Sequence, residues 1–253
     1  MGHWYGADTK PQHTVIGANG KERATSLADA RKRLLYPSVT SVMSIQEKPA
    51  LIEWLQTQLL DAAIKDPFHP QEWTADNWKK VMKARMRSVG NAAATRGTEI
   101  HNKLDLFFRG AGDYEDVDTP YLLPTIELIA KEFGMDGWKS EQSFADTKNG
   151  FAGCVDLYNQ EINIIIDFKT KDKENLKGVK QYDDHKIQLA AYQLGLNMSE
   201  DTKRYNLFIS THSYSPGECL LVECKEYNRY RDFFLALNKV WQIKNNYFPG
   251  ESE

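Results

Sequence analysis

The part of the chain after Gly134 alternates short β-branched runs with longer helical stretches. Five runs rich in β-branched and aromatic residues, bounded by turn residues, lie at 138–145, 151–158, 162–170, 205–210 and 219–224. Apolar residues recur at helical spacing over 120–134, 184–198 and 227–246. This order predicts an α/β fold with a mixed central sheet flanked by helices.

The first part of the chain has a different pattern. Residues 1–36 are polar and are expected to be irregular, and residues 36–42 form a β-branched run that Pro37 opens. A helix is predicted from Pro49, a second over 74–89 and a third that opens at Thr98, its plausible N-cap. The N-terminal part is therefore predicted to be a mostly helical lobe.

The composition indicates an ordinary globular protein. Of 253 residues, 41% are hydrophobic and 26% are charged, which excludes a disordered or collagen-like chain and fits a single domain. The sequence contains no apolar run of about 18 residues, so no membrane span is expected. Residues 1–10 lack the apolar core of a secretory signal. The three cysteines form no C-x-x-C pair, so a reducing cytoplasm is the expected setting.

Three polar residues stand out in two neighbouring strand candidates. Asp156 lies in the run 151–158, and Asp167 and Lys169 lie in the run 162–170, on the face opposite its isoleucines. A short turn joins the runs, so they are expected to pair as a hairpin on which Asp156 and Asp167 converge.

Two carboxylates beside a lysine suit the hydrolysis of a phosphodiester. Carboxylate oxygens bind hard cations such as Mg²⁺, a bound cation activates water, and a lysine stabilises the developing anion. An Asp-x-Lys triplet alone is more often a solvated hairpin surface, so further residues are needed to support this chemistry.

Two helical stretches supply those residues. His101 borders the apolar stripe of an amphipathic segment that includes Ile100 and Leu104, where a hydrogen-bonded structural histidine is the common alternative to a ligand. Gln188 and Tyr192 are four residues apart and share one face of a predicted helix, which is by itself uninformative.

Taken in order, these blocks carry a resemblance. Arg96-Gly97-Thr98-Glu99-Ile100-His101, Gly153-x-x-Asp156, Asp167-x-Lys169 and Gln188-x-x-x-Tyr192 together resemble the RecB-type branch of the PD-(D/E)xK nuclease superfamily over residues 96–192. The segment Tyr36-Pro37-Ser38-Val39-Thr40 more loosely resembles phage-encoded and mitochondrial single-strand DNA exonucleases of that group.

The resemblance implies a restriction-endonuclease-like core and assigns roles. It implies one nuclease domain over 1–253, with a DNA-binding lobe at 1–95 and the catalytic core at 96–253. The metal would be Mg²⁺, with Mn²⁺ as a substitute, and the three cysteines disfavour an iron–sulfur cluster. Lys169 would be the catalytic lysine, Gln188 and Tyr192 would brace the site or contact DNA, and Glu141 is a weaker ligand candidate. The implied metal ligands are His101, Asp156, Asp167 and the backbone carbonyl of Phe168.

The net charge of −3 conceals a basic segment. Residues 77–98 contain no acidic residue and carry +6, which leaves −9 for the remainder, including the acidic loop 110–119. Trp73 and Trp78 flank this segment and are equally well explained as base-stacking or as core residues. Ser38 and Thr40 are candidate phosphate donors, although a plain strand is an equal alternative. The basic residues are Lys79, Lys80, Lys83, Arg85, Arg87 and Arg96.

The sequence favours a Mg²⁺-dependent DNA nuclease, most plainly an exonuclease on DNA ends or single strands in phage-type replication, recombination or repair. Its partners would be DNA and replication or recombination proteins, with no membrane involved. Two alternatives stay open, namely a catalytically idle nuclease-like module that binds DNA and a structure-specific endonuclease on the same core.

Overall fold

The computed structural model describes residues 3–110 and 120–250. The chain divides into two compact units. Residues 1–46 and 103–253 form the first, and residues 47–102 form the second. Most of the acidic loop predicted at 110–119 lies outside the described residues. No helix in the described ranges is long and apolar enough to cross a membrane.

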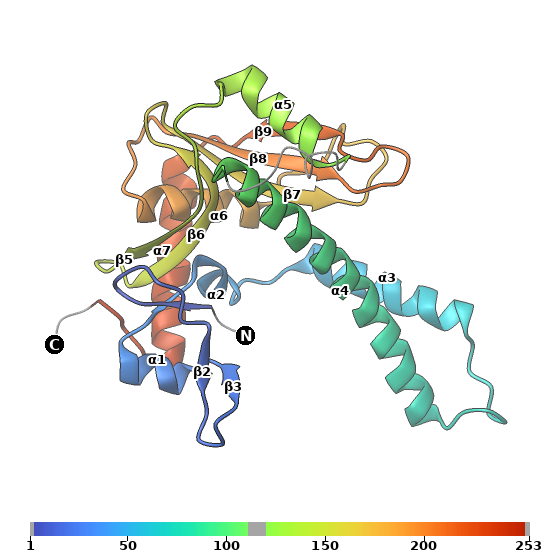
Figure 1. Cartoon of the computed structure of the whole chain (residues 1–253). Helices are drawn as coiled ribbons and strands as arrows, with labels where there is room; N and C mark the ends of the chain where they lie inside the picture. The colour runs from blue at the N-terminus through green and yellow to red at the C-terminus, as the bar shows by residue number, and fades with distance from the viewer. Residues whose placement is uncertain (1–2, 111–119, 251–253) are drawn as a thin grey trace. The chain divides into compact units, whose positions relative to one another are not determined.

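A five-stranded mixed sheet is the centre of the first unit (Figure 1). The strand order follows the sequence, β5-β6-β7-β8-β9, with β7 and β8 parallel and the other pairs antiparallel. This confirms the predicted mixed sheet with flanking helices. The strands are β5 (Lys139–Asp146), β6 (Phe151–Asn159), β7 (Ile164–Lys171), β8 (Lys203–Ser210) and β9 (Cys219–Glu223).

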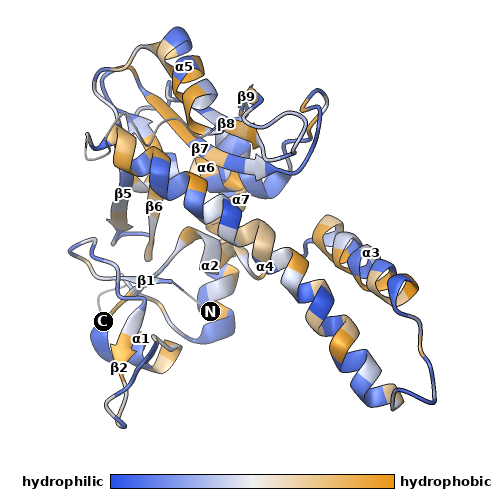
Figure 2. Ribbon diagram, turned by 45° about the vertical axis from the view of Figure 1, so that its right-hand side comes forward, coloured by the Kyte–Doolittle hydropathy of each residue, from blue (hydrophilic) through white to orange (hydrophobic). Residues whose placement is uncertain are grey.

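Helices cover both faces of this sheet. Helix α6 (Asp183–Gly195) connects the parallel strands and packs on one face, where His185 contacts Phe208, and α7 (Tyr227–Asn245) packs against α6. Helix α5 (Leu122–Phe133) lies on the other face, where Phe133 contacts Tyr205. Apolar residues are concentrated in the inner strands (Figure 2), as expected for strands buried on both faces.

Residues 1–46 are more ordered than their polar sequence predicts, so the expectation of an irregular segment is wrong. The segment is fixed by Trp4, which is buried against Trp241 and donates its indole N–H to the carbonyl of Thr25. Because single buried residues such as Trp4 order this segment, its sequence has no periodic apolar pattern that would predict its elements. The elements are β1 (Trp4–Tyr5), β2 (Thr14–Ile16), β3 (Glu22–Ala24), α1 (Leu27–Arg33) and β4 (Tyr36–Pro37), with β1 paired to β4 and β2 to β3.

The β-branched run at 36–42 is a strand only at Tyr36–Pro37. From Val39 to Met43 it forms the short helix α2, because the Ser38 hydroxyl accepts a hydrogen bond from the Ser41 N–H and caps the first turn. Val39 and Val42 are buried in the core on the side of the sheet that α6 covers, so tertiary packing outweighs their β-propensity.

The second unit consists of α3 (Pro49–Lys65) and most of α4 (Ala75–Phe108). The helices predicted at 74–89 and from Thr98 are one continuous helix, because the alanine-rich residues between them are good helix formers. Thr98 is therefore not an N-cap; its hydroxyl donates to the carbonyl of Ala94 at 3.1 Å.

Two helical glycines make opposite predictions about stability. A Cβ at Gly195 would lie 1.9 Å from the ring of Phe144, which is itself packed against Phe151 and Tyr192. Gly195→Ala is expected to lower the free energy of unfolding by about 1–3 kcal/mol through overpacking.

Gly90→Ala is the matched control, because a Cβ there meets only Trp54 at 3.8 Å, an ordinary contact. Alanine in a helix interior is then expected to stabilise by up to about 1 kcal/mol. Urea unfolding measures both; equal effects of the two substitutions would contradict the packing described around Phe144.

Candidate active site

Three carboxylates lie in one row across adjacent strands. Glu141 falls between the β5–β6 pairs Ser140–Leu157 and Gln142–Val155, so it stands opposite Asp156. Continuing the β6–β7 register by one residue beyond Leu157–Ile166 places Asp156 opposite Asp167. Opposite residues of antiparallel strands share a face, so the row presents Glu141, Asp156 and Asp167 on the side of the sheet that α6 covers.

Strands β6 and β7 stop pairing just before Asp156 and Asp167. Their paired register ends at Leu157 and Ile166, and beyond it the Asp156 carboxylate accepts a hydrogen bond from the backbone N–H of Phe168 at 2.8 Å. The side chain thus replaces a main-chain partner and holds the strands in a fixed relation. The hairpin predicted for these strands is present. Asp167 is not among the ligand atoms that lie within 4.8 Å of one another around Asp156, so the convergence of the two aspartates stays a prediction.

Asp167 is fully buried, and two side chains stabilise its carboxylate. Lys169 Nζ lies 2.7 Å from its Oδ2, and the Asn206 amide on the neighbouring strand β8 donates to the same oxygen at 2.7 Å. Burial alone would lower the pKa of Lys169, but the charges of Asp167 and Asp156 outweigh it, so the pKa lies above its usual value. Lys169 is therefore held as an ammonium group.

Helix α6 contributes a hydrogen-bond acceptor to Lys169 from the face of the sheet that it covers. The amide oxygen of Gln188 accepts a hydrogen bond from Lys169 Nζ at 3.1 Å, and its nitrogen donates to the Tyr192 hydroxyl at 2.6 Å. Burial, together with the charges of Asp167 and Asp156, raises the pKa of Tyr192 well above its usual range. Gln188 therefore orients Lys169, while Tyr192 remains a neutral phenol behind it.

Glu141, the weaker of the ligand candidates, lies close to Asp156. One ligand atom of each carboxylate lies within 4.8 Å of the other. Glu141 adopts a left-handed backbone conformation, φ 44°, and accepts a hydrogen bond from the Cys154 thiol at 3.1 Å. Burial and the charge of Glu141 raise the pKa of that thiol, so Cys154 stays protonated as a donor.

His101 is the predicted imidazole ligand. It lies on α4, between the buried residues Ile100 and Leu104, and is partly exposed. His101 belongs to the second unit and stays a predicted ligand. Within the first unit, the carboxylates of Glu141 and Asp156 could bind a metal ion. The identity of the metal rests on this donor set alone, and oxygen ligands favour a hard divalent cation.

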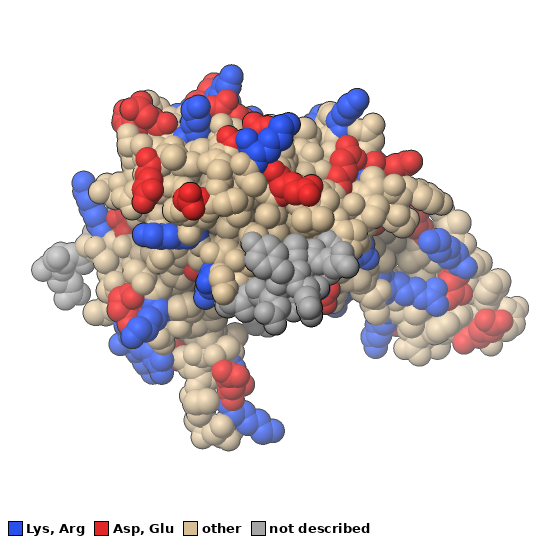
Figure 3. Space-filling model, turned by 45° about the horizontal axis from the view of Figure 1, so that its top comes forward, with Lys and Arg blue, Asp and Glu red and all other residues tan. Residues whose placement is uncertain are grey.

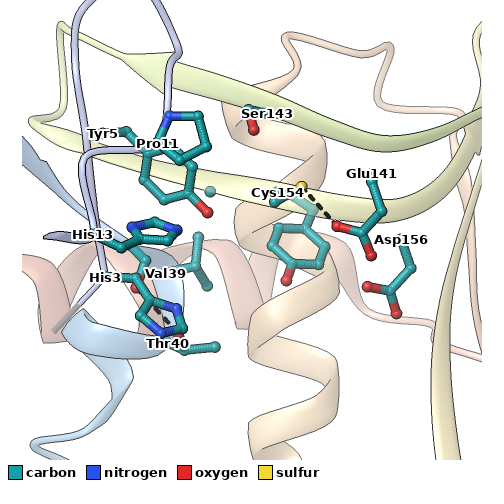
Figure 4. A pocket seen from close by; sticks show the side chains of 13 residues that line it. His3, Tyr5, Pro11, His13, Val39, Thr40, Glu141, Ser143, Cys154 and Asp156 are labelled. Carbon is teal, nitrogen blue, oxygen red and sulfur yellow. Dashed lines mark hydrogen bonds between the residues drawn. The ribbon is translucent and has the colours of Figure 1, made fainter. Parts of the chain in front are cut away.

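A pocket of about 400 Å³ opens beside Glu141 and Asp156 (Figure 4). Ser38, Val39 and Thr40 of the α2 segment line it. The Ser38 hydroxyl is within 3.1 Å of Thr40 Oγ1 and caps α2 as described above. Both predicted phosphate donors therefore face the same pocket as the two carboxylates.

The basic residues singled out in the sequence lie on α4, in the second unit. Lys83, Arg87 and Arg96 are exposed there, while Arg85 pairs with Asp66 at 2.9 Å. Trp78 has a structural role, since it contacts Phe68 and donates to the carbonyl of Asp66. On the face of the molecule drawn in Figure 3, cationic and acidic side chains are interspersed rather than gathered in one field.

Two polar residues near the row were missed by the sequence analysis. Asn206 is fully buried, donates to Asp167 and accepts from the Gln181 amide at 2.8 Å. A polar residue inside the apolar run 205–210 was the available signal, since a buried amide needs partners.

No family model matches the chain, and no curated protein matches it. Among solved structures, the crystal structure of SSO0001 matches 75% of this chain and 85% of its own, at 14% identity and a TM-score of 0.35. A "putative exonuclease" from Eubacterium rectale matches 59% of this chain and 66% of its own, at 17% identity and a TM-score of 0.40. TM-scores below 0.5 say nothing about what this chain binds or does.

The Asp167–Lys169 pair makes a prediction about stability. Asp167→Ala removes the carboxylate 2.7 Å from a lysine side chain that is only 21% exposed. Leaving that ammonium without its ion-pair partner is expected to cost about 2–3 kcal/mol, below the range for fully buried pairs.

The double variant Asp167→Ala, Lys169→Met is expected to recover part of this loss, because it removes the charge as well. Urea unfolding of the wild type, both single variants and the double variant gives the coupling energy. Additive effects would mean that the two side chains do not stabilise each other.

Proposed function

We propose that this protein is a metal-dependent DNA nuclease that hydrolyses phosphodiester bonds, acting as an exonuclease on DNA ends or single strands. The observation that carries the proposal is the row of Glu141, Asp156 and Asp167 with Lys169 on the same face of the sheet. The order of the sequence blocks, which resembles the RecB-type branch of the PD-(D/E)xK nucleases, also supports it.

In this proposal each polar residue has a role. His101, Asp156 and Asp167 hold a divalent cation, Mg²⁺ or Mn²⁺, together with the Phe168 carbonyl and Glu141. Such a cation supplies Lewis acidity and a nucleophilic water when bound. Lys169 stabilises the negative charge that develops on the phosphate and orients the attacking water, and Gln188 holds the ammonium group in place.

The donor set fits such a cation on two counts. Glu141 and Asp156 offer ligand atoms within 4.8 Å of each other, and hard divalent cations prefer carboxylate oxygens. A negative net charge is compatible with a nucleic-acid substrate, because a bound cation would meet the scissile phosphate.

DNA contacts are proposed at the pocket and on α4. Ser38 and Thr40 would hydrogen-bond phosphate oxygens, and Lys83, Arg85, Arg87 and Arg96 would contact the backbone. Such contacts carry no sequence information and are weakened by salt. A role in phage-type replication, recombination or repair, in a reducing cytoplasm, completes the proposal.

The alternatives differ in what happens to closed DNA. A structure-specific endonuclease would open covalently closed circles, which an exonuclease leaves intact. A catalytically idle module would bind DNA without degrading any form of it, but its function would not require carboxylates in a row beside a lysine.

Substitution of the site residues tests the proposal. Asp156→Asn and Lys169→Ala are each expected to lower cleavage of end-labelled single-stranded DNA by at least about a hundredfold, because they remove charge that acts in the transition state. DNA binding, measured by fluorescence anisotropy, should change far less. EDTA should abolish cleavage by the wild type.

Lys177→Ala is the control, since this lysine is exposed and lies on the loop after β7. His101→Ala is expected to raise the metal concentration for half-maximal activity about tenfold without changing thermal stability. Unfolding of His101→Ala would show that this histidine is structural, and wild-type turnover in Lys169→Ala would refute the site.

A further inference from the structure

The pocket of about 400 Å³ has two chemically different ends (Figure 4). Glu141 and Asp156 lie at one end, and the rings of the N-terminal segment lie at the other. The ring-bearing residues are His3, Tyr5, Pro11 and His13. The proposed cleavage chemistry uses the first end and leaves the second unexplained.

The rings at the second end form an ordered cluster. His3 stacks on His13 with ring centroids 4.6 Å apart, and Tyr5 meets His13 edge-on at 5.0 Å. The backbone N–H of Trp4 donates to Nδ1 of His13 at 3.2 Å, which assigns the proton of the neutral imidazole to Nε2. His13 therefore offers a hydrogen-bond donor on its other ring nitrogen.

The rings of His13 and Tyr5 are neutral. Burial and the neighbouring His3 lower the pKa of His13, so it is uncharged at neutral pH. Burial, with the charge of Glu141 as a smaller cause, raises the pKa of Tyr5, so its hydroxyl stays protonated. The stacked rings and the ring N–H of His13 suit a nucleobase.

The segment that carries these rings is fixed to the core. Trp4 is buried against Trp241, and Tyr5 pairs with Tyr36 across β1 and β4. Pro11 returns to Tyr5 through an isolated bridge. The rings thus form a positioned wall, which lowers the entropic cost of binding.

We propose that the His3, Tyr5, Pro11 and His13 end of the pocket is a nucleobase subsite, which receives the base of the nucleotide at the end of the strand that is cut. This rests on the proposed nuclease function. The volume is near the lower limit for small-molecule sites, so the pocket accommodates one nucleotide and not several.

Binding of single nucleotides tests the subsite without any cleavage. Isothermal titration in Mg²⁺ buffer compares deoxyadenosine monophosphate with deoxyribose 5-phosphate, which differ by the base. The wild type is expected to prefer the nucleotide about tenfold, within the range for stacking of one base. His3→Ala and His13→Ala should each bring this ratio close to one.

His212→Ala is the matched control, a histidine on the β8–β9 connection that does not line the pocket. His3 is exposed, and its backbone rather than its ring bonds Ser41, so its substitution leaves the fold intact. Equal affinity of the wild type for the two probes, or an unchanged ratio in both variants, would overturn the subsite.

Cleavage then separates the subsite from the nuclease function. Single-stranded oligonucleotides carrying an abasic unit at one end should show a KM about tenfold above that of the intact strand in the wild type, and no such difference in His3→Ala. Cleavage by the wild type with equal KM values would remove the subsite and leave the nuclease. A nucleotide preference without any cleavage would remove the nuclease and leave the subsite.

Discussion

The first unit is organised around a buried carboxylate. Asp167 lies in the middle of the sheet with no exposed surface, and an isolated charge there would be costly. Lys169 and Asn206 offset that cost from the same strand and from the neighbouring one. The parallel pairing of β7 with β8 places Asn206 beside Asp167, so this pairing stabilises the buried charge as well as the core.

Much of this could be read from the sequence after Gly134. All five strands and the three helices that flank them were predicted near their observed positions, because alternating apolar residues and turn residues mark strands directly. The hairpin that carries Asp156 and Asp167 was predicted correctly for the same reason. Asn206 was missed, since its role depends on a strand partner distant in sequence.

The N-terminal part shows where local patterns fail. Three of the five residues from Val39 to Met43 are β-branched, yet the segment forms a helix, because Ser38 caps it and the core buries Val39 and Val42. The burial of Trp4 orders a polar segment, and a single buried residue produces no periodic pattern in the sequence. Glu141 was only a weaker ligand candidate, because its closeness to Asp156 depends on the pairing of β5 with β6, which the sequence pattern does not specify.

The crossover from β7 through α6 to β8 has a consequence for how the site is made. The bond from Asn206 to Asp167 spans 39 positions, and Gln188, which holds Lys169, lies between them in sequence. During synthesis, therefore, Asp167 and Lys169 have no fixed geometry until β8 has left the ribosome and docked beside β7. A nascent or truncated chain that ends before β8 carries every acidic residue of the row but not the arrangement that could use them.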